Sequence, residues 1–278
     1  MTASALSTPR TVTITPNGED VYRSCTRRHR RRDPATASLA VLALVALLGL
    51  SRNVTAQGSP PMPAKEEEEV AHPFLTHMGI PEGVGVFSLR VAGLVTRADG
   101  KSDGDFSFHF ETGLTKAIGL HIRNDAFRTN PRTEVMFQFA AIMSKNGMSG
   151  FAPLIEFELP TRSGAGSRIE SLVGFTTALT NSEVAFNQVL HYNPREDALD
   201  ASAALVTRLA ERFFPVVEVL GEGGSGAPTV VSLLAGHKVR VREGVNLGIA
   251  YQFPVTGNRD FSSRVRLQPE FGWTTRRA

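Results

Sequence analysis

Phe106-Ser107-Phe108-His109-Phe110-Glu111 places an aromatic ring at every second position and a small or polar side chain after each ring. Successive side chains of a β-strand point to opposite faces, so this stretch presents its phenylalanines to one side and its polar residues to the other. The two faces require different surroundings, one apolar and one polar. The stretch therefore predicts a strand that separates two environments.

The same alternation recurs between Gly83 and Trp273, in twelve segments that each end at a short polar break. A strand that crosses a membrane at a tilt needs about 9–11 residues, and its lipid-facing and lumen-facing side chains alternate. We therefore expect an all-β fold, a transmembrane antiparallel β-barrel of about twelve strands. The predicted strands lie near 84–97, 106–111, 117–123, 134–141, 151–159, 168–179, 183–192, 199–211, 213–220, 229–241, 245–253 and 261–273.

The breaks between the segments carry a second signal, because longer and shorter connections alternate. Outer-membrane barrels show this alternation, since one end of the barrel carries loops and the periplasmic end carries tight turns. The longer breaks are 98–104, 124–132, 161–167, 193–197, 221–227 and 256–259, and the shorter ones are 115–116, 144–148, 180–181, 212 and 242–244. An even strand count also returns both ends of the barrel to the periplasm.

A soluble β-sandwich or lipocalin-like barrel is the alternative, because its strands alternate as well. The discriminating feature is the set of residues between the large apolar ones. That set is rich in glycine, alanine and serine, as at Ser88, Ala92, Gly174 and Ala250. A solvated outer face would carry mostly lysine and glutamate, so the composition favours a narrow membrane barrel with small residues inside.

The N-terminal region predicts export. Ser38–Leu50 is the only long apolar run, and it is shorter than the roughly 20 residues that a membrane helix needs. Arg27–Arg32 precedes the run, and Val54-Thr55-Ala56 follows it with small residues at the cleavage positions. We therefore predict a signal peptide over 1–56 and a mature chain that starts at Gln57. An uncleaved helical anchor is the alternative.

Charge and cysteine content narrow the function of the mature chain. Residues 1–56 hold eight arginines against three acids, which leaves 22 basic and 24 acidic residues in the remainder, so nothing indicates binding to nucleic acid. The single cysteine, Cys25, falls in the predicted leader, which excludes thiol catalysis and disulfides. Prolines and an acidic run predict a disordered periplasmic linker over 57–71, and the barrel is expected over 72–278.

The last predicted strand ends in Leu267-Gln268-Pro269-Glu270-Phe271-Gly272-Trp273. This ending resembles the aromatic-ended final strand that the barrel-assembly machinery recognises in outer-membrane proteins. The resemblance implies that Phe271 and Trp273 form the assembly signal. The tail Thr274–Ala278 departs from the pattern, because such proteins usually end on the aromatic residue itself.

The penultimate hairpin, Asn246–Phe261, resembles the transporter-like outer-membrane barrels of the phenol meta-pathway type. The resemblance is strongest over about the last thirty residues and general elsewhere. It implies passive passage of small molecules, aromatic or hydrophobic ones among them, through a barrel in the outer membrane of a Gram-negative-type bacterium. The implied partners are outer-membrane lipid, the barrel-assembly machinery and a small-molecule solute. A non-conducting structural or binding barrel is the alternative.

The inward-facing polar residues are the candidate functional set. The alternation predicts that the lumen is lined by Arg90, His109, Glu111, His121, Glu134, Glu156, Glu158, Arg264 and Arg266. Closure of the barrel would bring the three arginines together, opposite a wall of acids. That arrangement either orients a solute in an open lumen or forms ion pairs that stabilise a narrow barrel. The small inward residues leave room for water and favour the open lumen, with a preference for anions.

Catalytic and metal-binding patterns are weak. An outer-membrane phospholipase would carry a His-x-Ser pair on one strand, and no histidine here is followed by serine at that spacing. We therefore predict no enzymatic activity and no cofactor. His72, His77 and Met78 are weak candidates for a soft metal site, but Pro73 argues against a helix that presents both imidazoles on one face. The sequence favours exposed histidines and no metal.

Overall fold

The computed structural model describes residues 70–275 except 131, 146, 162–167, 225–228 and 257–260. The predicted signal peptide over 1–56 and residues 57–69 of the predicted linker lie outside the described residues. No described segment forms a helix that is long and apolar enough to cross a membrane.

The regular elements of the described chain are thirteen β-strands. They are β1 (Val86–Ala98), β2 (Lys101–Thr115), β3 (Ile118–Asn124), β4 (Arg132–Phe139), β5 (Ile142–Met143), β6 (Gly150–Pro160), β7 (Glu170–Thr180), β8 (Val184–Asn193), β9 (Ala198–Thr207), β10 (Phe213–Gly224), β11 (Val230–Arg242), β12 (Val245–Thr256) and β13 (Ser263–Thr274).

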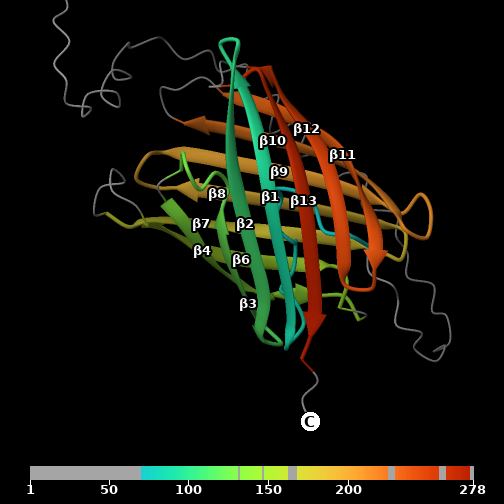
Figure 1. Cartoon of the computed structure of the whole chain (residues 1–278). Helices are drawn as coiled ribbons and strands as arrows, with labels where there is room; N and C mark the ends of the chain where they lie inside the picture. Colours follow the sequence, from blue (N-terminus) through green and yellow to red (C-terminus); the bar gives the residue numbers. More distant parts are fainter. Residues whose placement is uncertain are drawn as a thin grey trace, which may run out of the picture. The chain divides into compact units, whose positions relative to one another are not determined.

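Twelve of these strands close into one antiparallel ring. Neighbours follow chain order from β1 to β4 and from β6 to β13, while β4 pairs with β6 and β13 returns to β1. The two-residue β5 lies along β6 outside this ring. Figure 1 shows β13 beside β1, where the ring closes. The predicted all-β barrel and its strand number are therefore confirmed.

The predicted strands overlap those of the structure one for one, although several end at other residues. β2 differs most, because it runs from Lys101 to Thr115 rather than over 106–111. β9 ends at Thr207 rather than at 211, whereas β10 continues to Gly224 rather than stopping at 220. The glycine-rich Gly221–Gly224 has no apolar periodicity, yet it pairs residue by residue with Ala198–Ala201. Cross-strand hydrogen bonds define the strand here, and the sequence pattern does not show them.

The predicted alternation of connections holds only in part. Residues 98–104 were expected to form a loop, but β1 and β2 are joined by Asp99-Gly100, both with positive φ, and the hairpin continues beyond them. Two such residues form the tight turn that matches strand twist. Conversely, the predicted short break at 144–148 belongs to the longer connection 140–149.

Two ends of the barrel can be defined from these connections. The loop end is where β1 meets β2, β3 meets β4, β6 meets β7, β8 meets β9, β10 meets β11 and β12 meets β13. The turn end is where β2 meets β3, β4 meets β6, β7 meets β8, β9 meets β10 and β11 meets β12. β1 begins and β13 finishes at the turn end.

The outer face of the ring is apolar. Large apolar side chains stay exposed along the strands, as at Phe106, Val217 and Leu267. Ser107 and His109, which alternate with the phenylalanines of β2, are buried on the inner side. Soluble monomers rarely expose a contiguous apolar patch of more than a few hundred Å². An exterior of this kind is stable against lipid, and the predicted assignment of the two faces of β2 is confirmed.

The lumen is filled by the segment that precedes β1. Val70–Pro81 is buried throughout, and we call Val70–Glu82 the plug. Its first residues pack beside Val206 and Phe214 near the turn end, whereas its middle reaches Arg123 toward the loop end. The expectation that His72 and His77 are exposed is wrong, because the ring encloses the segment that carries them.

Candidate functional site

One carboxylate holds three consecutive backbone amides of the plug. Glu218 on β10 is fully buried, and it accepts hydrogen bonds from the amides of Phe74, Leu75 and Thr76. The Thr76 amide lies 2.8 Å from Oε2, and the Thr76 hydroxyl donates to the same oxygen at 2.9 Å. Buried amides need such acceptors, so Glu218 replaces the water that the plug loses on entering the lumen.

Two cations hold the carbonyl group at Pro73. Arg90 donates to the Pro73 oxygen at 2.7 Å, and Lys238 donates to it at 3.2 Å. Lys238 also pairs with Glu270, whose other oxygen lies 3.0 Å from Nδ1 of His72 in the plug. The positive charges that line this part of the lumen are therefore used to hold the plug.

Three further side chains complete the anchoring on the other side of the ring. Asn187 accepts from the amide of Gly79 at 2.8 Å, and Gln138 donates to the carbonyl of Met78 at 2.7 Å. Arg123 donates to the carbonyl of Leu75 at 3.2 Å. Side chains from opposite sides of the barrel thus satisfy the backbone of a segment that has no secondary structure of its own.

The small inward residues make room for the plug. A Cβ at Gly248 would lie 2.7 Å from the ring of Phe74, and one at Gly119 would lie 3.0 Å from Pro81. Phe74 packs in the main apolar cluster of the lumen with Phe214 and other buried residues. The expectation of a water-filled lumen is therefore wrong for the described chain, because the space left by the small residues is occupied by protein.

Arg90 pairs with a carboxylate on the neighbouring strand. Its Nη2 lies 2.6 Å from Oε1 of Glu111, and His109 and His121 approach the same oxygen at 3.1 and 3.0 Å. All four are buried. The predicted basic wall opposite an acidic wall is wrong for these residues, because the pairing acid lies on β2, directly beside β1.

The three predicted arginines do not converge. Arg90 lies opposite Glu270 in the β1–β13 pair, and Arg266 lies opposite Leu94. Arg266 is buried and donates to Ser107 at 2.8 Å, whereas Arg264 donates to Thr96 at 3.0 Å. Strand register separates side chains that share a seam, and the sequence could not supply the register.

The predicted assembly residues lie on the outer face of the closing seam. Phe271 and Trp273 are both exposed on β13. The indole of Trp273 stacks on the ring of Phe87 on β1, with 5.5 Å between the ring centroids. The pair is placed at the turn end, where β13 finishes.

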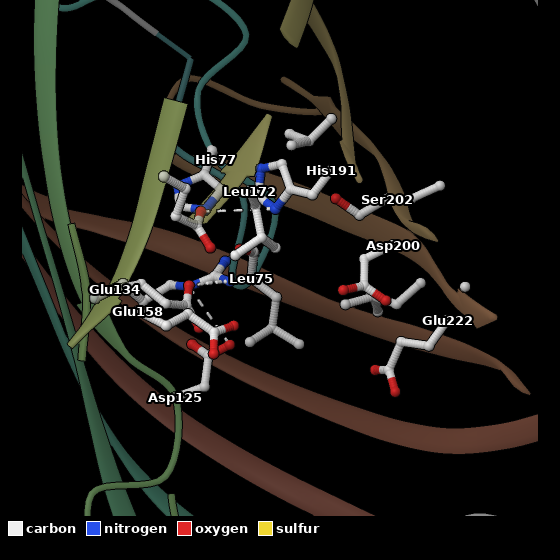
Figure 2. Close-up of a pocket in the computed structure, with 16 residues that line it drawn as sticks. Leu75, His77, Asp125, Glu134, Glu158, Leu172, His191, Asp200, Ser202 and Glu222 are labelled. Carbon is white, nitrogen blue, oxygen red and sulfur yellow. Dashed lines mark hydrogen bonds and ion pairs between the residues drawn. The ribbon is translucent and has the colours of Figure 1, made fainter. Parts of the chain in front are cut away.

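A cavity of about 200 Å³ lies beside the middle of the plug (Figure 2). It is lined by the remaining predicted acids, Glu134, Glu156 and Glu158. Arg123 lies among them and forms ion pairs with Glu134 at 2.5 Å and Asp125 at 3.6 Å. The acids thus outnumber the arginine that they surround. The charged and imidazole residues that line the cavity are His77, Arg123, Asp125, Glu134, Glu156, Glu158, His191, Asp200 and Glu222.

His77 belongs to the plug, and its imidazole forms part of the wall of this cavity. Burial, and then the charge of Arg123, hold the pKa of its imidazole well below the ordinary value. His77 is therefore neutral near neutral pH. No local pattern could predict its neighbours, since His77, His109 and His191 come from three distant parts of the chain.

Ser88 and His72 meet inside the lumen. The Ser88 hydroxyl lies 3.2 Å from Nδ1 of His72, and Glu270 approaches the same nitrogen at 3.0 Å. The other nitrogen, Nε2, faces Glu82 at 3.1 Å. The hydroxyl of Ser88 and the carboxylate of Glu270 therefore share Nδ1, and a second carboxylate faces Nε2.

Sequence comparisons find no relatives of this chain. No family model matches the sequence, and no curated protein matches it.

Solved structures of outer-membrane channels and porins align with this chain. The COG4313 outer membrane channel from Pseudomonas putida F1 aligns with a TM-score of 0.50 and 8% identity, over 77% of this chain and 100% of that one. The KdgM porin aligns with a TM-score of 0.49 and 9% identity over 66% and 98%, and the NanC porin with 0.47 and 8% over 67% and 99%. At such identities the likeness concerns the fold alone.

Proposed function

We propose that the chain is an outer-membrane channel for small solutes, and that the plug closes its lumen until it is displaced. The observation that carries the proposal is the inward polar set, whose side chains bind the backbone of the plug. A barrel built only for stability would fill its interior with its own side chains. Here a single connected segment fills the lumen and can leave it without opening the ring.

Placement in the outer membrane is part of the proposal. The apolar exterior supports contact with lipid, and the predicted leader over 1–56 supports export with cleavage before Gln57. The exposed Phe271 and Trp273 support recognition by the barrel-assembly machinery. The plug enters from the turn end, which on this reading faces the periplasm.

Small polar cations are the solutes that the lining favours. The cavity above the plug is bordered by more carboxylates than arginines, and low-dielectric walls strengthen the field of such a cluster. The resemblance of the Asn246–Phe261 hairpin implies small aromatic molecules, but no phenylalanine, tyrosine or tryptophan of the described chain lines this cavity. The anion preference expected from Arg90 loses its basis, because Arg90 is paired with Glu111.

A non-conducting structural or binding barrel is the second candidate, and the occupied lumen favours it. No enzymatic step is part of either proposal. The two candidates differ in whether the plug can be displaced while the ring stays intact.

Planar-bilayer recording of the refolded mature chain tests the proposal. Glu218→Gln keeps the shape of the side chain but removes the charge that the plug amides bind. Hydrogen bonds to a charged group contribute about 1.5–3 kcal/mol, so the variant should open more often than the wild type. Glu183→Gln, on an exposed turn, is the matched control. Correctly folded Glu218→Gln protein that never conducts would leave the non-conducting barrel.

A further inference from the structure

His77 at the middle of the plug presents an unpaired nitrogen to the cavity. Its Nδ1 lies 3.2 Å from Nε2 of His109, while its own Nε2 has no hydrogen-bond partner among residues 70–275 as described. The side chain is almost completely buried, with an exposed fraction of 1%. A buried polar atom without a partner calls for an explanation, and an unseen ligand is one of the few available.

Two further unpaired atoms lie beside it. Nε2 of His191 on β8 and Oε2 of Glu156 on β6 also lack hydrogen-bond partners in the described part of the chain. Nδ1 of His191 lies 3.6 Å from that carboxylate oxygen, which is too long for a hydrogen bond. The rings of His77 and His191 have centroids 5.7 Å apart, and Figure 2 shows both at the cavity wall.

We propose that His77, Glu156 and His191 form a binding site for a first-row divalent transition-metal ion. One ligand atom from each residue lies within 4.8 Å of the others, and all three side chains are buried. Two imidazoles and one carboxylate are a ligand set that zinc and other ions of this series accept, with the remaining positions open. Water in the adjoining cavity would fill those positions.

The chemistry of the ligands selects the class of ion. Mg²⁺ and Ca²⁺ prefer sets made of oxygen atoms, whereas imidazole nitrogens suit zinc, cobalt, nickel and copper. The cavity is also lined by Glu158, Asp200 and Glu222, whose charges favour a cation. The positive charge of Arg123 is directed to Glu134 and Asp125, with which it forms ion pairs.

The hydrogen-bond partner of Nδ1 of His77 is one that a metal-binding histidine would have. Metal-binding histidines usually donate their other N–H to a neighbouring acceptor, and His77 Nδ1 has His109 in that position. His109 must then carry its own proton on Nδ1, which lies 2.7 Å from Nη2 of Arg90. Arg90 can only donate, so with this tautomer of His109 its Nη2 donates to Glu111, which already lies 2.6 Å away.

A neighbouring cluster could compete for the same imidazole. His77 also lies within ligand distance of His109, Glu111 and His121. In that cluster, however, Glu111 Oε1 already faces Arg90, and His121 Nε2 lies 2.6 Å from the oxygen of Gln138. Oε2 of Glu111 also lacks a partner within the described chain, but both ring nitrogens of His109 and of His121 have one. Nε2 of His191 has none among the described residues, which is why we place the ion there.

The site goes beyond the proposed channel function and does not depend on it. Its ligands come from the plug and from two strands of the ring, so an ion bound there would tie the plug to the wall. Binding can be measured on the folded protein whether or not it conducts.

Cobalt binding to the refolded mature chain in detergent tests the site. Co²⁺ should bind with the visible absorption of a nitrogen-containing site, Zn²⁺ should displace it, and Mg²⁺ should not. Glu156→Gln and His191→Gln should each weaken binding by roughly tenfold or more. His237→Gln is the matched control, because this histidine lies on β11 against Phe213, outside the lumen, and should leave binding unchanged.

Heat-modified migration on gels establishes that each variant is folded. Folded wild-type protein that binds no Co²⁺ overturns the proposal, as does binding that survives both Glu156→Gln and His191→Gln. Loss of binding in His121→Gln with retention in His191→Gln would place the ion in the neighbouring cluster and also overturn it.

Discussion

Single side chains of the ring hold the plug through its backbone. Glu218, Arg90, Lys238 and Asn187 each meet an amide or carbonyl group of residues 73–79. Backbone groups are the same in every residue, so this recognition depends on the position of the strand residue and not on the plug side chain. The alternation of residues predicted that Arg90 points inward, but a partner in the plug could be found only from the register of distant segments.

Close packing at Gly248 gives a prediction at this scale. Gly248→Ala would place a methyl group 2.7 Å from the ring of Phe74, which is rigid and must move. We expect plug docking to weaken by about 1–3 kcal/mol, as for other overpacked cores. Hydrogen exchange of the Phe74–Thr76 amides should accelerate.

Gly93→Ala serves as the control for that substitution. Gly93 lies on β1 with no atom within 4 Å of an added Cβ, so exchange of the same amides should stay at the wild-type rate. Equal rates in all three proteins would mean that the contact of Phe74 with β12 does not hold the plug.

His72 makes plug docking depend on pH. Burial alone would lower its pKa, but the charges of Glu270 and Glu82 raise the pKa well above the ordinary value in the docked plug. The stabilisation is therefore complete below the ordinary histidine pKa of about 6.5 and is lost as pH rises through the raised value. Chymotrypsin should cleave the plug faster as the pH is raised from neutral.

Replacement of the imidazole separates this effect from other titrations. His72→Gln removes the titrating group while keeping a hydrogen-bonding side chain, so cleavage should be faster at neutral pH and should change little with pH. A wild-type cleavage rate that falls as pH rises would contradict the assigned role of His72.

At the scale of elements, the strands could be predicted and the plug could not. Most strands have a period of two because their faces meet different surroundings, and that period can be read within the strand itself. The plug contains Pro73, Gly79 and Pro81 and has no period. Its burial depends on twelve strands closing around it, so the sequence supported only a linker and two exposed histidines.

The outward face of β2 gives a prediction for the strands. Phe108→Arg would place a charge on the lipid face and should cost roughly 2–4 kcal/mol of folding free energy in liposomes if the residue lies near the midplane. Ser102→Arg, at the exposed end of the same strand, should cost little. The same folding free energy in Phe108→Arg and the wild type would indicate that the faces of β2 are reversed.

For the whole molecule, the barrel and its plug divide two tasks. The ring provides an apolar exterior and a closed set of backbone hydrogen bonds, which a membrane requires. The plug fills the lumen and is held there by polar contacts with the ring. It is the segment that precedes β1 in the sequence. The sequence predicted the ring and its inward residues. That these residues bind the backbone of the plug could be found only from the structure, which shows the ring and the plug together.

Thiol accessibility inside the lumen tests the closed barrel most directly. With Cys25 replaced by serine, the chain has no other cysteine, so a single introduced thiol reports its own surroundings. Thr76→Cys places it at a position whose side chain has an exposed fraction of 1%, and Ser102→Cys places it on an exposed hairpin. With a membrane-impermeant reagent on the folded protein, we predict rapid labelling at 102, protection at 76, and loss of that protection when Glu218→Gln is added. Labelling at 76 as fast as at 102 in the otherwise wild-type barrel would contradict the account.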